Sequence, residues 1–251
     1  VYPSAIGPCL VVALDVGGVG NTPLDDLFTG VSANGSTPNA IGLLRNTAGA
    51  FSGQGALLSS TAPVALGGAV TLKSGLPRFA AAMYRGGASD ILRVYDVSAG
   101  SLVAVLQTPP LAPGSEWAHA RFDAGPLAKF LFFQPGESNG TLRVRAVQEP
   151  LPGNYAFGSE AAFPLGSALR QVCILPQAVG ARLLVIFEPG TTGRVYDFDG
   201  VNPPVPVQDL AAAAGELRGV AVHLELRADP LIASLAQGAD AANDGTGAGG
   251  Q

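Results

Sequence analysis

Three short segments of the chain share one alternating pattern of apolar and polar residues. They read ILRVYDV, TLRVRAV and GRVYDF, and each contains an arginine at an equivalent place, namely Arg93, Arg143 and Arg194. Strict alternation is typical of a strand with one half-exposed face. The arginines are 50 and 51 residues apart. This spacing predicts a repeat of about 51 residues along the chain.

A strongly apolar strand that ends in glycine precedes each of these segments. These strands lie at residues 78–86, 129–136 and 182–190, and two more of the same kind lie at residues 25–30 and 230–238. Continuous apolar runs of this length indicate burial on both faces. An earlier strand of each unit fits at residues 11–16, 69–74, 118–123, 171–175 and 219–224. The Pro-rich connections that follow, QTPPLAPG and NPPVPVQ, suit sheet edges and not central strands.

The pattern predicts an all-β fold, because many short strands are separated by turn signals. Repeated antiparallel units of this length suit a β-propeller of about five blades, the last one incomplete, with the first strand of each blade innermost. Two β-sandwich domains are the alternative. The Ala-rich stretch 209–217 is expected to add at most one helical turn. The propeller would be a single repeat domain over 1–239, with units 1–58, 59–110, 111–163, 164–211 and 212–239, followed by a flexible tail over 240–251.

Residues 11–51 resemble a blade of the FG-GAP/VCBS type, the integrin-like propeller repeat. The resemblance rests on ALDVGGVG, LDDLFTG and IGLLRNTAGAF, and it is only skeletal in the later units. In that family the loop between the first two strands binds calcium through carboxylates, which implies Asp15, Asp25 and Asp26 as ligands here. Gly17 stands at the next ligand position without a side-chain oxygen, whereas calcium needs roughly six to eight oxygens. We therefore expect a degenerate loop and no cofactor, with calcium as the alternative.

Charge and composition restrict the possible partners. The net charge is −5, and the two lysines, Lys73 and Lys129, belong to no basic cluster. Because affinity for nucleic acid depends on grouped Lys and Arg, we expect no nucleic-acid partner. No apolar run reaches the roughly 18 residues of a membrane span. Few lysines, many small residues and two cysteines are compatible with a secreted, periplasmic or cell-surface protein.

Few residues suggest catalysis. Asp197 and Asp199 are two residues apart in YDFDG and would share one strand face. His119 and His223 lie on predicted first strands without the ligand spacing of a zinc site, so ordinary half-buried histidines are expected. Cys9 and Cys173 are expected to be small buried thiols, with a disulfide between them as the alternative. We assign no residue a catalytic role.

The aromatic residues and the candidate acids lead to two opposed hypotheses. Tyr95 and Tyr196 recur in register, which buried packing between blades explains as well as a sugar-binding surface does. The leading hypothesis is a non-catalytic binding or scaffolding propeller that recognises a protein or glycan. The alternatives are a hydrolase or lyase with a site at the propeller channel mouth, or a purely structural segment of a longer surface protein. Convergence of the two aspartates and two histidines in one pocket would favour the enzyme.

Overall fold

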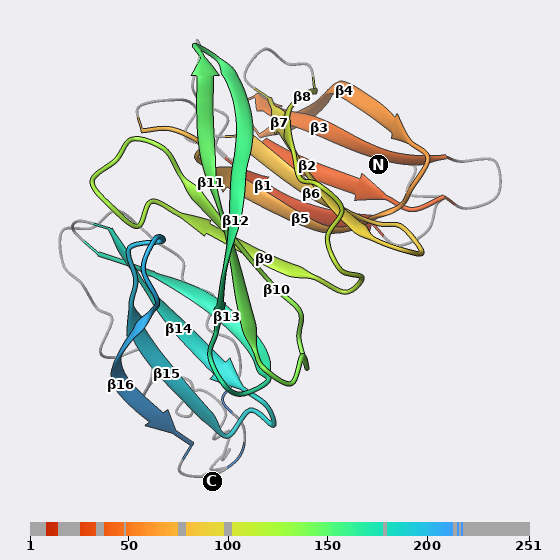
Figure 1. Cartoon of the computed structure of the whole chain (residues 1–251). Coiled ribbons are helices and arrows are strands. Elements are labelled where there is room, and N and C mark those ends of the chain that lie inside the picture. The colour runs from red at the N-terminus through yellow and green to blue at the C-terminus, as the bar shows by residue number, and fades with distance from the viewer. Residues whose placement is uncertain are drawn as a thin grey trace, which may run out of the picture. The chain divides into compact units, whose positions relative to one another are not determined.

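The computed structural model describes residues 9–14, 26–33, 38–47, 49–74, 79–97, 102–177, 180–212, 215 and 217. These residues form strands, turns and loops without a helix (Figure 1). The prediction of an all-β fold is therefore confirmed. Across the described ranges, no helix is long and apolar enough to cross a membrane. The predicted fifth unit, apart from residues 212, 215 and 217, and the predicted tail lie outside the described residues.

The described strands form four sheets of four strands each, in chain order, and every neighbouring pair is antiparallel. The first sheet contains β1 (Cys9–Leu14), β2 (Asp26–Val31), β3 (Asn39–Thr47) and β4 (Ala50–Ser59). The second contains β5 (Pro63–Val70), β6 (Phe79–Arg85), β7 (Asp90–Asp96) and β8 (Val103–Gln107). The third contains β9 (Glu116–Ala120), β10 (Lys129–Phe133), β11 (Thr141–Leu151) and β12 (Asn154–Pro164). The fourth contains β13 (Leu169–Pro176), β14 (Ala181–Phe187), β15 (Thr192–Asp197) and β16 (Val205–Ala211).

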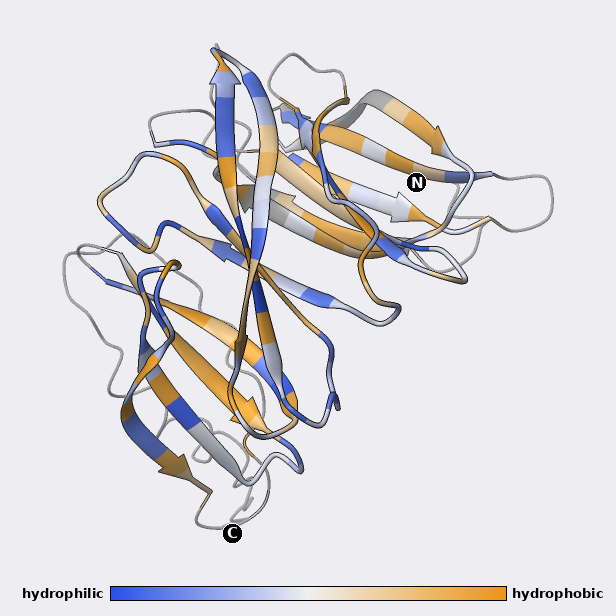
Figure 2. Ribbon diagram, in the orientation of Figure 1, coloured by the Kyte–Doolittle hydropathy of each residue, from blue (hydrophilic) through white to orange (hydrophobic). Residues whose placement is uncertain are grey.

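The second strand of a sheet is the most buried one, as the apolar runs predict. Every residue of β10 is buried, and β6 is buried until its last residue. The third strands β7 and β11 alternate between buried and half-buried positions, in agreement with the pattern of LRVYD and LRVRA. Figure 2 shows β14 as a largely hydrophobic strand between more polar neighbours. Central strands therefore supply most of the core.

Neighbouring sheets pack through three apolar clusters. The first two sheets share one that includes Phe28 and Tyr95. The second and third sheets share another, which includes Met83 and Phe130. The third joins the third sheet to the fourth, and Leu131 belongs to it. The described sheets are thus connected in sequence, each to the next.

The three arginines of the sequence pattern occupy equivalent positions in their sheets. Arg93 lies opposite Ala82, Arg143 opposite Phe132, and Arg194 opposite Val185, in each case across the second and third strands. Partners across an antiparallel pair share one face of the sheet. The second-strand partners lie in the cluster that faces the preceding sheet. In sheets two to four, the face that contains these second-strand partners therefore packs against the preceding sheet.

Several sequence-based expectations were wrong in detail. Each sheet has a fourth strand that the sequence did not predict. β16 includes Pro206 of NPPVPVQ, which was expected to be a connection, whereas the prolines of QTPPLAPG do lie in the connection after β8. β16 is an edge strand, which tolerates the missing N–H of proline. The first strand of the second sheet is β5 rather than 69–74, since residues 71–74 form a loop with a single bridge at Lys73. Asp209–Ala211 end β16 instead of starting a helical turn.

Candidate binding groove

A groove of about 430 Å³ lies at one end of the fourth sheet, where β14 begins and β15 ends. We call it the Asp197 groove. Its wall continues into the β15–β16 connection and includes Phe122 from the β9–β10 connection. Ligand pockets in proteins commonly have volumes of roughly 300–1,000 Å³, and this groove falls within that range. The lining residues are Phe122, Gln177, Ala181, Arg182, Asp197, Phe198, Asp199, Asn202, Pro203 and Val205.

Asp199 organises the loop on one side of the groove. Its Oδ1 accepts hydrogen bonds of 2.8 Å from the backbone N–H groups of Val201 and Asn202. Its Oδ2 accepts a bond of 2.7 Å from Nδ2 of Asn202. These bonds stabilise the carboxylate and lower the pKa of Asp199 to about 2. The side chain is therefore ionised at neutral pH and serves the turn.

Asp197 and Arg182 form the polar wall on the other side. They lie directly opposite each other on β15 and β14, and Nε of Arg182 donates to Oδ1 of Asp197 at 2.6 Å. Both side chains are well exposed, at 57% for Asp197 and 40% for Arg182. The pair therefore leaves polar atoms available at the surface of the groove.

A buried lysine fixes this loop to the third sheet. Nζ of Lys129 donates to Oδ2 of Asp123 and to the backbone carbonyl of Asp199, each at 2.6 Å. The ammonium group lowers the pKa of Asp123. Gly200 has a φ of +75°, and a Cβ atom there would lie 2.3 Å from Cδ of Lys129. The close approach of lysine and backbone thus requires glycine at this position.

Packed aromatic rings form part of the groove lining. The Phe122 and Phe198 rings meet edge to face with centroids 5.2 Å apart, and Phe163 packs on Phe198 at 5.6 Å. Phe122 and Phe198 are buried. Edge-to-face pairs of this kind add to the stability of a core. Phe122 and Phe198 thus line the groove and also belong to the apolar cluster between the third and fourth sheets.

His119 does not join the two aspartates in this groove. His119 lies on β9, stacked on Phe130 with ring centroids 5.4 Å apart and close to Trp117 at 5.7 Å. Its Nε2 accepts a hydrogen bond from the backbone N–H of Thr71 at 3.4 Å. Burial lowers the pKa of His119 to about 4, so the ring is neutral at pH 7. His223 lies outside the described residues.

The aromatic residues that recur in the sequence pack inside the protein. Tyr84 and Tyr95 are buried, and their hydroxyl groups are hydrogen-bonded at 2.7 Å. Tyr196 is buried as well, with the guanidinium of Arg194 over its ring. Trp117 packs against Gly67, where a Cβ atom would lie 2.4 Å from the indole. These side chains form no exposed stacking surface.

Of the three residues implied as calcium ligands, Asp26 alone belongs to the described part of the chain. It is buried, and its Oδ1 accepts a bond of 2.7 Å from the backbone N–H of Asn46. Arg45 is 3.9 Å from its other oxygen. Asp15 and Asp25 lie outside the described residues. Within the described ranges, no group of three or more His, Cys, Asp or Glu side chains is arranged to hold a metal ion.

Cys173 is buried on β13, as expected for a small thiol. The side chain of Cys9, at the start of β1, lies outside the description.

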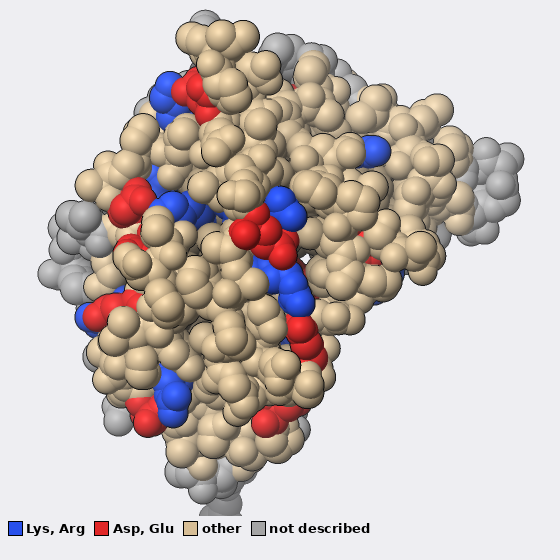
Figure 3. Space-filling view, in the orientation of Figure 1, with Lys and Arg blue, Asp and Glu red and all other residues tan. Residues whose placement is uncertain are grey.

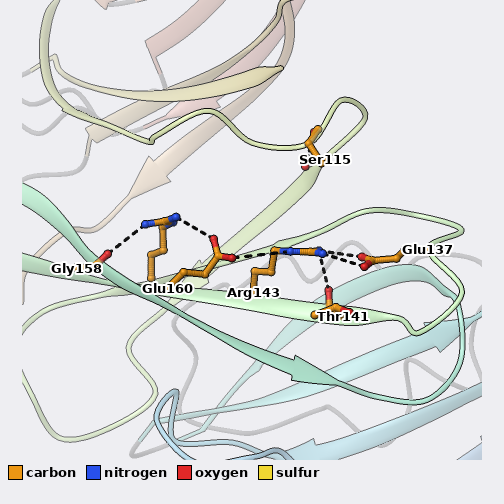
Figure 4. Close-up of polar contacts among 8 residues, drawn as sticks. Ser115, Glu137, Thr141, Arg143, Gly158 and Glu160 are labelled. Atoms are coloured by element: carbon orange, nitrogen blue, oxygen red, sulfur yellow. Dashed lines mark hydrogen bonds and ion pairs between the residues drawn. The ribbon is translucent and has the colours of Figure 1, made fainter. Parts of the chain in front are cut away.

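A second set of charges lies on the third sheet. Arg143 binds both oxygens of Glu137, at 2.8 and 2.9 Å, and Arg145 contacts Glu160 at 3.0 Å (Figure 4). Glu160 also lies 3.9 Å from Arg143, so the four side chains form one chain of ion pairs. The charges balance one another. Figure 3 shows positive and negative side chains close together rather than in patches of one sign.

The sequence indicated Asp197 and Asp199 but not the rest of the groove. Lys129 is the other residue that the sequence could have indicated, since a lysine at the head of the apolar run KFLFF must find a partner for its charge. The sequence does not indicate Arg182, Asn202 or Phe122, because only the fold brings these residues close together.

A scan against protein-family models found no match to this chain, and a search of curated proteins found none either.

Proposed function

We propose that this chain is a non-catalytic binding or scaffolding protein that recognises a glycan or a protein through the Asp197 groove. The proposal rests on the hydrogen bonding and ionisation of the groove's polar groups. Asp199 is held ionised by three hydrogen bonds, and Asp197 is paired with Arg182. Groups fixed in this way can orient a ligand's hydroxyl or amide groups, and general acid catalysis needs a proton that Asp199 does not hold.

A glycan is the ligand that the lining favours. The walls mix donors and acceptors, from the guanidinium of Arg182, the amides of Gln177 and Asn202, and the carboxylate of Asp197. The lining carries one positive charge, on Arg182, and two negative charges, on Asp197 and Asp199, so the groove lacks a strong net charge. A neutral ligand with many hydroxyl groups matches such a surface, because each hydroxyl both donates and accepts.

A β-propeller is the architecture that we propose for the chain. Four-stranded antiparallel meanders are the usual blades of propellers. The cluster between the second and third sheets supports this architecture, since two independent sandwiches would place their boundary there. Expression of residues 1–111 and 112–251 as separate halves tests the point. The propeller predicts that neither half folds cooperatively alone, whereas two sandwich domains predict that both do.

The location of the protein follows from its proposed role. A binding protein for glycans or surface proteins is expected to be secreted, periplasmic or exposed on the cell surface. No cofactor is required for such binding.

The test of the function compares binding with turnover. The intact chain is screened against immobilised glycans and candidate protein partners, and in parallel against a panel of hydrolase and lyase substrates. We expect selective binding and no turnover. Turnover that is lost in the Asp197→Asn or Asp199→Asn variant, without any binding, would favour the enzyme instead.

A further inference from the structure

One row of residues in the Asp197 groove changes from charged to apolar across three strands. Arg182 of β14 lies opposite Asp197 of β15, and Asp197 lies opposite Val205 of β16. Partners across antiparallel pairs share one face of a sheet. All three residues line the groove, and Val205 is 61% exposed. The row therefore presents hydrogen-bond donors, an acceptor and an apolar surface to the same ligand.

The ion pair in this row leaves part of its hydrogen-bonding capacity unused. Its hydrogen bond joins Nε of Arg182 to Oδ1 of Asp197. The terminal nitrogens of the guanidinium and Oδ2 of the carboxylate lie outside that bond. A guanidinium has five N–H groups, so it can hold one partner and donate to another, and a carboxylate accepts at both oxygens. A ligand bound here must therefore offer an acceptor to Arg182 and a donor to Asp197.

The apolar end of the row is exposed next to an ordered turn. Val205 and Pro203 both line the groove and are exposed. Asp199 holds the turn that precedes them, because it accepts hydrogen bonds from Val201 and Asn202. Contact between an exposed valine and an apolar group of a ligand is favourable, since it removes apolar surface from water. A ligand with hydroxyl groups alone leaves this wall without a matching group.

We propose that the Asp197 groove binds an N-acetylated amino sugar, an inference that rests on the proposed glycan-binding function. The acetamido group of such a sugar carries one acceptor, one donor and one methyl group. Its carbonyl accepts a hydrogen bond from Arg182, its N–H donates to Asp197, and its methyl group contacts Val205. A free amino group would be attracted by the one excess negative charge of the lining, but it supplies neither the acceptor nor the methyl group.

Three sugars that differ only at C2 test the proposal on the intact chain, namely N-acetylglucosamine, glucose and glucosamine. Titrations followed by NMR give the three dissociation constants. We expect N-acetylglucosamine to bind at least about tenfold more tightly than either of the others, because it adds a buried methyl group and a matched pair of hydrogen bonds. Equal binding of glucose, or tighter binding of glucosamine, would overturn the proposal.

The glycan array separates failure of this proposal from failure of the proposed function. If N-acetylglucosamine does not bind while the array shows other bound glycans, the acetamido assignment is wrong and the glycan-binding function stands. If no glycan binds at all, both are wrong.

Two valine variants test the contact with the methyl group. Val205→Thr keeps the β-branched shape and replaces a methyl group by a hydroxyl, so the preference for N-acetylglucosamine over glucose should fall at least about threefold. Val207→Thr is the matched control, since Val207 is 46% exposed on the same strand and does not line the groove. Circular dichroism checks that both variants are folded. An unchanged preference in Val205→Thr, or an equal fall in Val207→Thr, would contradict the contact.

Discussion

Lys129 of the third sheet donates a hydrogen bond of 2.6 Å to the backbone carbonyl of Asp199 in the fourth. The lysine side chain is 9% exposed, and the loop that it holds forms one wall of the Asp197 groove. A single buried ammonium group thus connects the packing of two sheets to the shape of the candidate site.

The first prediction concerns this connection. Lys129→Met keeps most of the side-chain volume and removes the charged hydrogen bonds, so the free energy of unfolding should fall by about 1–3 kcal/mol. Lys73→Met is the control, because Lys73 is 36% exposed and pairs with Glu149 near the surface. Its cost should stay within about 1 kcal/mol. Urea denaturation measures both, and equal costs would contradict the buried role of Lys129.

Two glycines with nearly the same φ allow the cost of a steric contact to be measured separately from the cost of backbone strain. Gly200 and Gly153 have φ values of +75° and +77°, but a Cβ atom would meet Lys129 only at Gly200, with nothing within 4 Å at Gly153. Gly200→Ala should cost about 2–4 kcal/mol, from strain and overpacking together. Gly153→Ala should cost about 1 kcal/mol, from strain alone. Thermal and urea unfolding of the two variants check the difference, which should vanish if the loop moves away from Lys129.

Acid should destabilise the protein through His119. Its pKa is lowered to about 4 by burial, whereas histidine in an unfolded chain titrates near 6.5. The unfolded state therefore binds a proton first, and stability present above pH 6.5 is lost as the pH falls towards 4. The loss amounts to at most about 3 kcal/mol. His119→Phe should flatten the stability profile in this window. An unchanged pH dependence of the unfolding free energy in that variant would show that other titratable groups control the acid destabilisation.

Calcium is expected to have little effect. A ligand that binds only the folded state raises the melting temperature, whatever its site. Because Asp26 already accepts a hydrogen bond from Asn46, it is poorly placed to act as a free ligand. We expect calcium or a chelator to shift the melting temperature by less than about 1 °C. A rise of several degrees with calcium would instead indicate that the loop of Asp15, Asp25 and Asp26 retains a site.

The sequence predicted the central strands well and the fourth strand of each sheet poorly. Apolar runs mark the central strands β6, β10 and β14, and the arginines at 93, 143 and 194 mark the strands beside them. These strands pack into the core, so their sequences show a regular apolar pattern. The fourth strands carry few buried side chains, such as Leu106 of β8 and Tyr155 of β12, so their residues follow no clear apolar period. In β16 five consecutive residues are exposed, and one is a proline. Nothing in such a pattern separates a strand from a loop.

The candidate groove was only partly predictable for a related reason. The spacing of Asp197 and Asp199 identified two acids that do line one groove. Their roles differ because Asp199 lies beyond the end of β15 and caps a turn, while Asp197 pairs across the strand. His119 was correctly expected to be an ordinary histidine. The partners from other segments, such as Phe122 and Lys129, are brought to the groove by packing between sheets.

The most direct measurement compares two arginine variants on an immobilised glycan array. Arg182 and Arg194 each pair with an aspartate across neighbouring strands of the fourth sheet, but only Arg182 lines the Asp197 groove. We predict that the wild-type chain binds a defined subset of glycans, that Arg182→Ala weakens this binding at least about tenfold, a loss of about 1.4 kcal/mol, and that Arg194→Ala retains it. Glycan binding that Arg182→Ala leaves intact, or the absence of any bound glycan, would contradict a glycan-binding role for the groove.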